Sequence, residues 1–338
     1  MNKGTLFGKT ITELEQIVAD AAMPAFTAKQ IAQWLYQKRA ATIDDITNLS
    51  KKAREQLSLK YDMGVGAPVG EVESVDGTKK YLFRANNLFV ESAYIPDENR
   101  KTLCVSSQVG CKMNCTFCMT GKQGFQGQLT ASEILNQIRS ISESEQLTNV
   151  VYMGMGEPLD NYGEVMKSID ILTSEWGYGR SPRRINLSTV GIMPAMKRFV
   201  EESEVHLAIS LHSPFHSERR ELMPVESAYP IAETVTMLRN YDFSGQRRLS
   251  FEYIMFAGIN DTPAHVKGIA KLLNGLRCRI NLIKFHAIPD SSLCGSAADK
   301  MVWFANQLNQ KGFIATIRRS RGEDIQAACG LLSTNASP

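Results

Sequence analysis

Three cysteines stand within eight residues of this chain, at Cys111, Cys115 and Cys118, and their CxxxCxxC spacing constrains the protein more than any other feature. Thiolates are soft ligands that suit zinc and iron–sulfur clusters. A closed structural zinc site takes four ligands, usually as two separated pairs, whereas this group supplies three and no second pair follows. Three thiolates on a four-iron cluster leave one iron open. The spacing therefore favours a [4Fe–4S] cluster that can bind an outside ligand.

This arrangement resembles the cluster motif of radical S-adenosylmethionine (SAM) enzymes. A zinc knuckle and buried cysteines without a ligand are the alternatives. The polar residues Lys112, Asn114 and Thr116 between the thiols argue against the second alternative. The spacing is far more specific than one glycine-rich loop would be.

The length and composition describe a soluble protein. A chain of 338 residues is long enough for a barrel-sized domain and a small accessory domain. No apolar run approaches the roughly 18 residues that a membrane span needs, and the N-terminus lacks the apolar core of a signal peptide. We therefore expect a cytoplasmic protein without membrane contact, in which cysteines bind metal, act in catalysis or stay free.

A net charge of +3 is a weak argument for nucleic-acid binding. One arginine doublet is more often a solvated surface feature than an RNA contact, whereas several near one active face favour RNA. The clustered arginines are Arg183, Arg184, Arg219, Arg220, Arg247, Arg248, Arg318, Arg319 and Arg321.

The first 65 residues are expected to form a small helical accessory domain that binds RNA. Apolar residues recur at helical spacing between positions 10 and 59, and Thr10 with Glu13 forms a plausible capping box. An all-helical docking domain without a ligand fits the same pattern. Residues 66–100 then show turn-punctuated, Val-rich and aromatic stretches that predict β-hairpins, and Glu91 lies in the last of them. A carboxylate on a strand usually faces solvent.

Strands and helices alternate over residues 101–332, which predicts a parallel sheet with helices outside it. Six such units with a metal site favour a partial (β/α)6 barrel over a complete eight-fold one. Residues 333–338 are expected to be a flexible tail. The predicted strands are 103–108, 149–154, 184–190, 206–212, 249–255, 280–286 and 313–319, and the predicted helices are 131–145, 162–175, 193–202, 231–241, 264–276 and 298–310.

Polar motifs follow the ends of these strands, where barrel enzymes place their chemistry. The cysteine loop follows the first strand and the run 154–158 follows the second. Ser188, Ser210 with His212, and His286 end later strands, so we expect one site at this rim. Taken singly, each of these polar motifs also has an ordinary structural explanation, such as a turn or a hydrogen-bonded residue at the end of a strand.

Cys329 lies after the last predicted strand, flanked by alanines and a glycine and preceded by three arginines. It is either a small buried residue or a nucleophile whose pKa the arginines depress. Cys278 and Cys294 are expected to take no part in the chemistry.

The sequence resembles the RlmN/Cfr family of radical SAM RNA adenosine methyltransferases. Matching stretches are 104–111, the cysteine triplet, 120–125, 153–159, 210–214 and 327–330. Val109 and the segment 121–125 resemble the RlmN branch, which modifies carbon 2, more than Cfr, which modifies carbon 8. Met119 and His286 stand where family members commonly carry Ala and Asn.

The resemblance implies a role for each matching residue. Cys111, Cys115 and Cys118 would hold the [4Fe–4S] cluster. The implied SAM contacts are Gly156, Glu157, Ser188, Ser210, Leu211, His212 and His286, and the implied catalytic residues are Cys329, Cys104 and Glu91.

The implied mechanism uses two SAM molecules per turnover. Cys329 first accepts a methyl group, a radical from the second SAM removes hydrogen from that group, and the carbon adds to the adenine ring. Glu91 removes the ring proton. Cys104 then attacks Cys329, which releases the RNA and leaves a transient disulfide.

The implied partners are 23S ribosomal RNA in its peptidyl-transferase region, the tRNA adenosine 3′ of the anticodon, and a flavodoxin- or ferredoxin-type electron donor; a monomer is expected. Either RNA must be presented unstacked, with its backbone held by the arginines and the N-terminal helices. The alternatives are Cfr-like carbon-8 methylation, a radical SAM enzyme on a non-RNA substrate, and a metal-containing RNA-binding module without catalysis.

Overall fold

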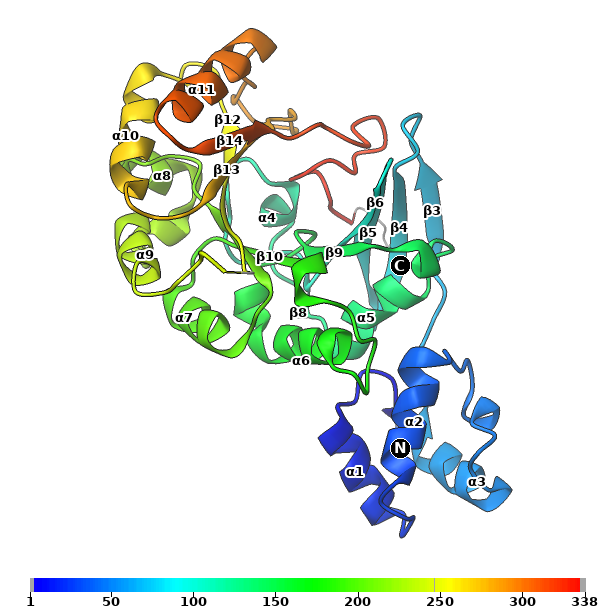
Figure 1. The fold of residues 1–338 in the computed structure, drawn as a ribbon. Coiled ribbons are helices and arrows are strands. Elements are labelled where there is room, and N and C mark those ends of the chain that lie inside the picture. The colour runs from blue at the N-terminus through cyan, green and yellow to red at the C-terminus, as the bar shows by residue number, and fades with distance from the viewer. Residues whose placement is uncertain (1–2, 246, 335–338) are drawn as a thin grey trace.

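A computed structural model describes residues 3–245 and 247–334 of the chain. A group of N-terminal helices precedes one large sheet, and further helices cover the outer face of that sheet (Figure 1). Within the described ranges, no helix is long and apolar enough to cross a membrane.

The N-terminal helices are short and are joined by tight turns. They are α1 (Ile11–Asp20), α2 (Thr27–Ala32) with a π-helical continuation (Gln33–Gln37), and α3 (Lys51–Lys60), and β1 (Gly4–Thr5) pairs with β2 (Tyr61–Asp62) beside them. The predicted capping box is confirmed, because the Glu13 N–H donates to Thr10 Oγ1 at 3.3 Å and the Thr10 N–H donates to the Glu13 carboxylate at 2.8 Å.

One buried arginine attaches these helices to the sheet domain. Arg139 is the last residue of α5 (Ala131–Arg139), and its guanidinium donates to the backbone carbonyls of Leu35, Arg39 and Ala40 at 2.9, 2.8 and 2.6 Å. Carbonyls at the end of a helix lack intrahelical donors and attract a cation. The N-terminal helices are therefore docked on α5, below the sheet domain in Figure 1.

The large sheet has ten strands in the order β14-β13-β12-β11-β10-β9-β6-β5-β4-β3. The seven from β6 to β14 in this sheet are mutually parallel, and β5, β4 and β3 continue it antiparallel, so the predicted hairpins extend the barrel sheet itself. Because β14 does not pair with β3, the barrel is open, as the sequence predicted. The strands are β3 (Gly70–Glu73), β4 (Lys79–Ala85), β5 (Leu88–Asp97), β6 (Arg100–Val105), β9 (Asn149–Tyr152), β10 (Ile185–Thr189), β11 (His206–Ser210), β12 (Leu249–Met255), β13 (Arg279–Lys284) and β14 (Ile314–Ile317), with a separate antiparallel pair of β7 (Gln108–Val109) and β8 (Gly127–Gln128).

The helices after the strands match the predictions except in three places. The helix predicted over 131–145 ends at Arg139, and only a 3-10 turn (Ser144–Gln146) follows. The short helices α4 (Met119–Gln123) and α8 (His216–Leu222) were missed, because neither is long enough to show an apolar stripe. The others are α6 (Tyr162–Thr173), α7 (Met193–Glu202), α9 (Ile231–Leu238), α10 (Pro263–Leu273) and α11 (Ala298–Gln310).

The apolar core lies between the sheet and its outer helices, and the inner face of the barrel is different. Thr102, Asn186, Ser250 and Asn281 from four strands point inward and line a cavity. A complete eight-stranded barrel fills this space with branched apolar side chains. Here the lumen is open, and polar side chains share its wall with apolar ones such as Val151 and Ile283.

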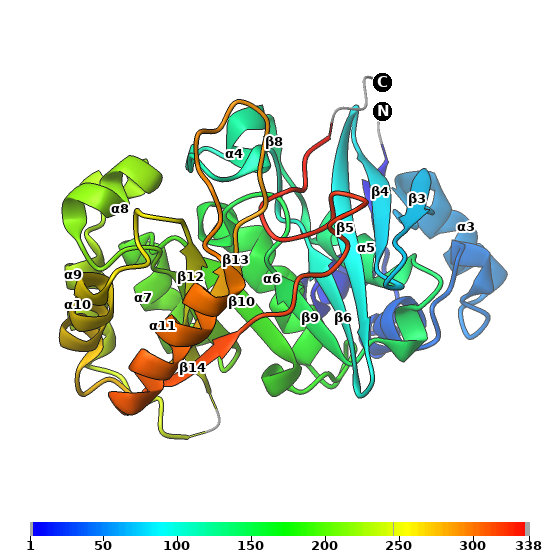
Figure 2. The ribbon, with the colours of Figure 1, turned by 90° about the horizontal axis from the view of Figure 1, so that it is seen from above.

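The segment after β14 crosses the open side of the barrel to reach the β3–β4 hairpin (Figure 2). The Gly322 N–H donates to the Asp76 carboxylate at 3.0 Å, and Ser74 Oγ donates to Asp324 at 2.6 Å. Ser333 and Thr334 are also hydrogen-bonded, so the predicted flexible tail is wrong for these two residues. Residues 335–338 lie outside the described chain.

Candidate active site

A cavity of about 820 Å³ occupies the lumen and the carboxyl ends of the parallel strands. Nearly all the residues that the sequence singled out line it, although they come from seven separate segments. Two do not: Glu91 and Leu211 have no place in the cavity wall, and the Leu211 side chain is fully buried in the core. The lining residues that were predicted are Cys104, Cys111, Cys115, Cys118, Gly156, Glu157, Ser188, Ser210, His212, His286 and Cys329.

The cysteine loop is held in place by its own glycine and by the C-terminal segment. Gly110 enters the loop with φ of 70°, and a Cβ there would lie 1.6 Å from the Gly124 carbonyl oxygen, so only glycine fits. At the other end the Met119 N–H donates to the Gly330 carbonyl at 2.8 Å. The loop that carries the three thiols is thus tied to the segment that carries Cys329.

The three thiols fit a four-iron cluster. Burial raises the pKa of Cys111 to about 12 and also raises that of Cys115, so their thiolates require positive charge nearby, which iron supplies. Over residues 3–245 and 247–334, no three His, Cys, Asp or Glu side chains converge on a point where one metal ion would sit. A cluster binds each thiolate through a different iron, and its ligands need not converge in that way.

Gly156 and Glu157 form the turn after β9. Gly156 has φ of 98°, and a Cβ there would lie 2.5 Å from Gln108 Cβ. The buried Glu157 carboxylate accepts hydrogen bonds from Thr189 Oγ1 at 2.6 Å and the Val190 N–H at 2.9 Å. Burial raises the pKa of Glu157 to about 7, and these donors oppose the rise. Glu157 thus joins the ends of β9 and β10 while lining the cavity.

His212 lies just beyond β11 with a positive φ of 53°. Its Nδ1 accepts the Ile254 N–H at 3.0 Å, and its ring meets the edge of Phe117 with centroids 4.8 Å apart. Burial, with the charge of Arg219, lowers the pKa of His212 to about 3. His212 is therefore neutral, with its proton on Nε2.

His286 is buried in the cavity wall after β13, and its ring lies between two polar side chains. Nε2 lies 3.1 Å from Ser320 Oγ, while Nδ1 lies 3.2 Å from Glu323 without hydrogen-bond geometry. Nε2 is thus engaged by Ser320, whereas Nδ1 has no hydrogen-bond partner among the described residues.

Cys104 and Cys329 come from β6 and the C-terminal segment and share the cavity with the cysteine loop. Cys329 is exposed to the cavity but surrounded by protein, and this burial raises its pKa although Arg318 opposes the rise. The predicted depression of the Cys329 pKa is therefore wrong for the protein alone, because desolvation outweighs the cation. All seven cysteines are free thiols, so the expected disulfide between Cys104 and Cys329 is absent from this state.

Glu91 on β5 is buried, contrary to the usual exposure of a strand carboxylate. It pairs with Lys80 Nζ at 3.0 Å and accepts the Ser333 N–H at 3.0 Å. Burial raises its pKa, and Lys80 opposes the rise. Two residues along β5, on the same face, Ala93 packs against Cys104.

Sequence reasoning missed Glu252 on β12, which lines the cavity and is only 4% exposed. Its Oε1 accepts hydrogen bonds from Asn281 Nδ2 at 2.8 Å and Ser250 Oγ at 3.2 Å, and its Oε2 lies 3.6 Å from Arg318. The signal was available, because Ser250 and Glu252 alternate with apolar residues along an otherwise hydrophobic strand.

Two of the clustered arginines hold the fold, and two others, Arg184 and Arg248, lie with Arg279, which the sequence did not single out, at the amino end of the lumen. Arg219 is fully buried, so the prediction that it contacts RNA is wrong. Arg247 donates to the Val200 carbonyl at 2.7 Å and thereby stabilises the fold. Arg184, Arg248 and Arg279 are exposed at the amino end of the lumen, and among the described residues no carboxylate lies within 4.0 Å of them.

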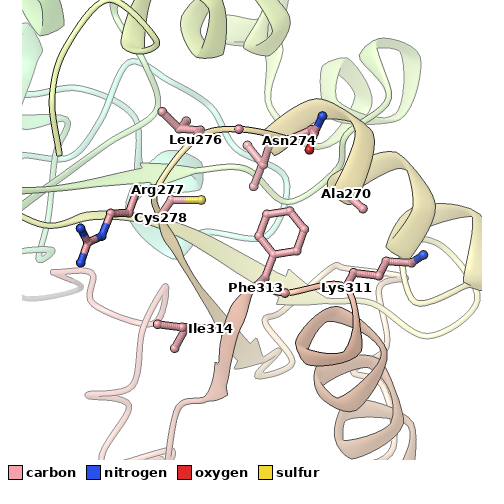
Figure 3. Close-up of a pocket in the computed structure, with 11 residues that line it drawn as sticks. Ala270, Asn274, Leu276, Arg277, Cys278, Lys311, Phe313 and Ile314 are labelled. Atoms are coloured by element: carbon pink, nitrogen blue, oxygen red, sulfur yellow. The ribbon is translucent and has the colours of Figure 1, made fainter. Parts of the chain in front are cut away.

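A second cavity of about 560 Å³ lies at the amino ends of β13 and β14, against the ends of α10 and α11 (Figure 3). Arg277, Cys278 and Phe313 line it, and none of the predicted site residues does. Burial alone raises the pKa of Cys278 to about 12. Cys278 thus lines a different cavity from the one that holds the predicted site residues.

Comparison with known families identifies the class of protein. Residues 105–273 match the model of the radical SAM superfamily, and residues 5–62 match the ribosomal RNA large subunit methyltransferase N-terminal domain. The crystal structure of a radical SAM methyltransferase from Sphaerobacter thermophilus superposes on this chain with a TM-score of 0.91 and 38% sequence identity. The superposition covers 97% of this chain and 99% of that one. The fold and the cysteine loop are thus those of a radical SAM enzyme.

Full-length relatives narrow the class to one family. The chain is 61% identical over 335 residues to a probable dual-specificity RNA methyltransferase RlmN of Bacteroides fragilis, covering 99% of this chain and 97% of that protein. It is 40% identical to the dual-specificity RNA methyltransferase RlmN of Syntrophus aciditrophicus, covering 99% and 98%. The chain belongs to the RlmN family, which confirms the family expected from its motifs.

Proposed function

We propose that this enzyme methylates carbon 2 of an adenosine in the peptidyl-transferase region of 23S rRNA and of the tRNA adenosine 3′ of the anticodon. Relatives that are named dual-specificity RNA methyltransferases support RNA as the substrate. The observation that carries the chemistry is the meeting of two extra sulfurs, Cys104 and Cys329, with the three thiols of the cysteine loop in one cavity.

Carbon 2 of adenine bears hydrogen and is not nucleophilic, so it does not displace methyl from SAM directly. Cys329 does so instead: its thiolate takes the methyl group, and S-adenosylhomocysteine leaves. When bound by Cys111, Cys115 and Cys118, a [4Fe–4S] cluster with a second SAM supplies the radical that removes one hydrogen atom from this methyl group. The carbon on Cys329 sulfur then bonds to the adenine ring, which links protein and RNA.

Glu91 and Cys104 complete the reaction in this proposal. Glu91 removes the ring proton, and the adduct gives up one electron, which the cluster held by Cys111, Cys115 and Cys118 would accept. The burial of Glu91, which raises its pKa, suits a general base. Its carboxylate must first leave its ion pair with Lys80 and its hydrogen bond with the Ser333 N–H before it can contact the adenine ring. The Cys104 thiolate attacks Cys329 sulfur and forms a disulfide with it. The carbon leaves with the electron pair of the carbon–sulfur bond and takes up a proton from water, which completes the methyl group on the RNA, and a reductant reopens the disulfide.

The polar rim supports SAM binding. Gly156 permits close approach of a ligand to the backbone, Glu157 offers a carboxylate to the SAM amino group, and His212 keeps its Nε2–H as a donor. Ser188 and Ser210 line the same wall. Leu211 would contact SAM through its backbone alone, and His286 only after leaving Ser320.

The arginines at the amino end of the lumen support an RNA partner. Arg184, Arg248 and Arg279 present three guanidinium groups that suit phosphodiesters at the mouth of a cavity deep enough for one unstacked nucleotide. The N-terminal helices add a second contact with the RNA backbone. A flavodoxin- or ferredoxin-type protein supplies the electron.

The test is a pair of cysteine variants in the cluster-loaded enzyme, incubated with SAM, reductant and RNA. Cys104→Ala is expected to accumulate protein cross-linked to RNA, and Cys329→Ala to form neither cross-link nor methylated RNA. Cys294→Ala, in an exposed loop, is the matched control and should keep wild-type turnover. Full turnover by Cys329→Ala would refute the proposal, and mass spectrometry of the RNA product distinguishes carbon 2 from carbon 8.

A further inference from the structure

Arg318 stands where the C-terminal segment leaves the sheet. Its backbone N–H donates to the Leu282 carbonyl at 2.8 Å, which continues the pairing of β14 with β13 by one residue. Its side chain lines the cavity, with Nη1 3.6 Å from Met153 Sδ and 3.6 Å from Glu252 Oε2. The guanidinium thus lies in the lumen, whereas Arg319 beside it is exposed.

Glu252 forms an ion pair with this guanidinium. Its carboxylate is buried and is fixed by Asn281 and Ser250 through Oε1, so Oε2 remains for Arg318. Within the described chain, no other Lys, Arg or His lies within 4.0 Å of this carboxylate. A buried carboxylate that is fixed on one side and meets a single cation on the other orients that cation.

The same guanidinium shares the cavity wall with both extra sulfurs, Cys104 and Cys329. Its positive charge lowers the pKa of each of these two thiols. Ala327, two residues before Cys329, packs against Cys104, which holds the C-terminal segment on β6. Burial raises the pKa of Cys104 to about 12 and also raises that of Cys329, and Arg318 opposes the rise at both thiols.

We propose that Arg318, oriented by Glu252, is a positioning residue that stabilises the two thiolates in succession, Cys329 before it accepts the methyl group and Cys104 before it attacks. The inference rests on the proposed roles of the two cysteines. Methylation converts the Cys329 thiolate into a neutral thioether, so the guanidinium then has only one thiolate to stabilise. One cation therefore serves both steps. The charged and titratable groups that meet here are Cys104 from β6, Glu252 from β12, Arg318 after β14 and Cys329.

The test measures thiolate formation without turnover. Cluster-loaded protein without SAM is alkylated with iodoacetamide across a pH series, and each cysteine is followed by peptide mass spectrometry. Arg318→Met is expected to move the half-maximal pH of Cys329 upward by about one pH unit, which is about tenfold less thiolate at a given pH. The half-maximal pH of Cys329 in Arg318→Lys should lie between the wild-type value and the Arg318→Met value. Arg319→Met is the matched control and should leave the curve in place.

Cys278 is an internal reference in the same digest, because it lies in the separate cavity of Figure 3 and its pKa is raised by burial alone. A Cys329 shift no larger than that of Cys278, or equal shifts in Arg318→Met and Arg319→Met, would overturn the proposal. A variant that loosens the whole fold would shift the alkylation curves of Cys278 and Cys329 alike, so the difference between the two cysteines still reports the effect of Arg318.

A second measurement separates stabilisation of a thiolate from a merely structural role. The rate at which SAM methylates Cys329 should fall about tenfold at neutral pH in Arg318→Met and recover as the pH is raised. A loss that does not recover with pH contradicts the inference. If wild-type Cys329 is never methylated, the proposed function fails, whereas the alkylation result still decides the role of Arg318.

Discussion

Replacement of Arg219 by Met is expected to destabilise the protein and disturb the rim that is proposed to bind SAM. The fully buried guanidinium donates to the carbonyls of Val190 at 2.9 Å, Ser210 at 2.8 Å and Leu211 at 3.0 Å. These carbonyls end β10 and β11. The guanidinium also forms an ion pair with Glu226, whose side chain is 1% exposed.

The size of the effect follows from what remains buried after the change. Methionine fills part of the space but leaves three carbonyls without this donor and Glu226 without its cation. Removal of one partner from a buried ion pair costs about 3–5 kcal/mol. Glu226 keeps hydrogen bonds with the Ile231 N–H at 3.0 Å and with His216 Nδ1 at 2.9 Å. We therefore expect a loss of about 3–4 kcal/mol, toward the lower end of that range.

Urea unfolding followed by circular dichroism measures this loss. Arg220→Met, at the exposed neighbouring position, is the control and should stay within about 0.5 kcal/mol of wild type. The double variant Arg219→Met/Glu226→Met should recover part of the loss, because it removes the stranded carboxylate. The reasoning is refuted if Arg219→Met is as stable as Arg220→Met, or if the double variant is no more stable than the single.

Three further predictions concern the turn after β9 and the amino end of the lumen. Gly156→Ala should weaken SAM binding at least tenfold in calorimetry, because a Cβ would lie 2.5 Å from Gln108 Cβ at a φ of 98°, while Gly163→Ala, in open space, should bind normally. RNA affinity should be measured at several salt concentrations in the triple variant Arg184→Gln/Arg248→Gln/Arg279→Gln. The slope of log affinity against log salt concentration should decrease by about 2 in magnitude, whereas Arg220→Gln should leave it unchanged. An unaltered slope in the triple variant would exclude these arginines as phosphate contacts. Burial and the surrounding arginines lower the pKa of His206 from 6.5 to about 4. Between these pH values the unfolded chain binds more protons than the folded one, so the free energy of unfolding should fall as the pH drops from 6.5 toward 4. His206→Asn should lose less stability over this range in unfolding experiments, and an equal dependence of stability on pH in the variant and the wild type would contradict the shift.

Local sequence signals predicted local structure well. The Thr10–Glu13 capping box involves side chains three residues apart, and the turn at Asn86 between β4 and β5 is set by a residue that tolerates its φ of 53°. The rim of the barrel could also be predicted, because the carboxyl ends of parallel strands meet at one edge of a sheet. Ser188 and Ser210 were expected there and do line one cavity.

Features that depend on distant partners could not be predicted. Arg219 and Arg220 are indistinguishable in sequence, yet one is buried against Glu226 and the other is exposed. Glu91 looked like an ordinary exposed strand residue, but it is buried, with Lys80 on the neighbouring strand and Ser333 of the C-terminal segment in contact with its carboxylate. The pKa of Cys329 depends on how much protein surrounds it, which its flanking alanines do not reveal.

The lining of the lumen has a consequence for how this protein can vary. Most of the apolar burial lies between the sheet and the outer helices, while a smaller apolar cluster around Phe117, Ile254 and Ile283 borders the cavity. The outward faces of the strands therefore contribute mainly to stability, whereas the inward faces are shared between stability and the site. Inward polar positions such as Thr102 and Asn186 can accordingly be exchanged with less loss of apolar burial than positions that face the helices.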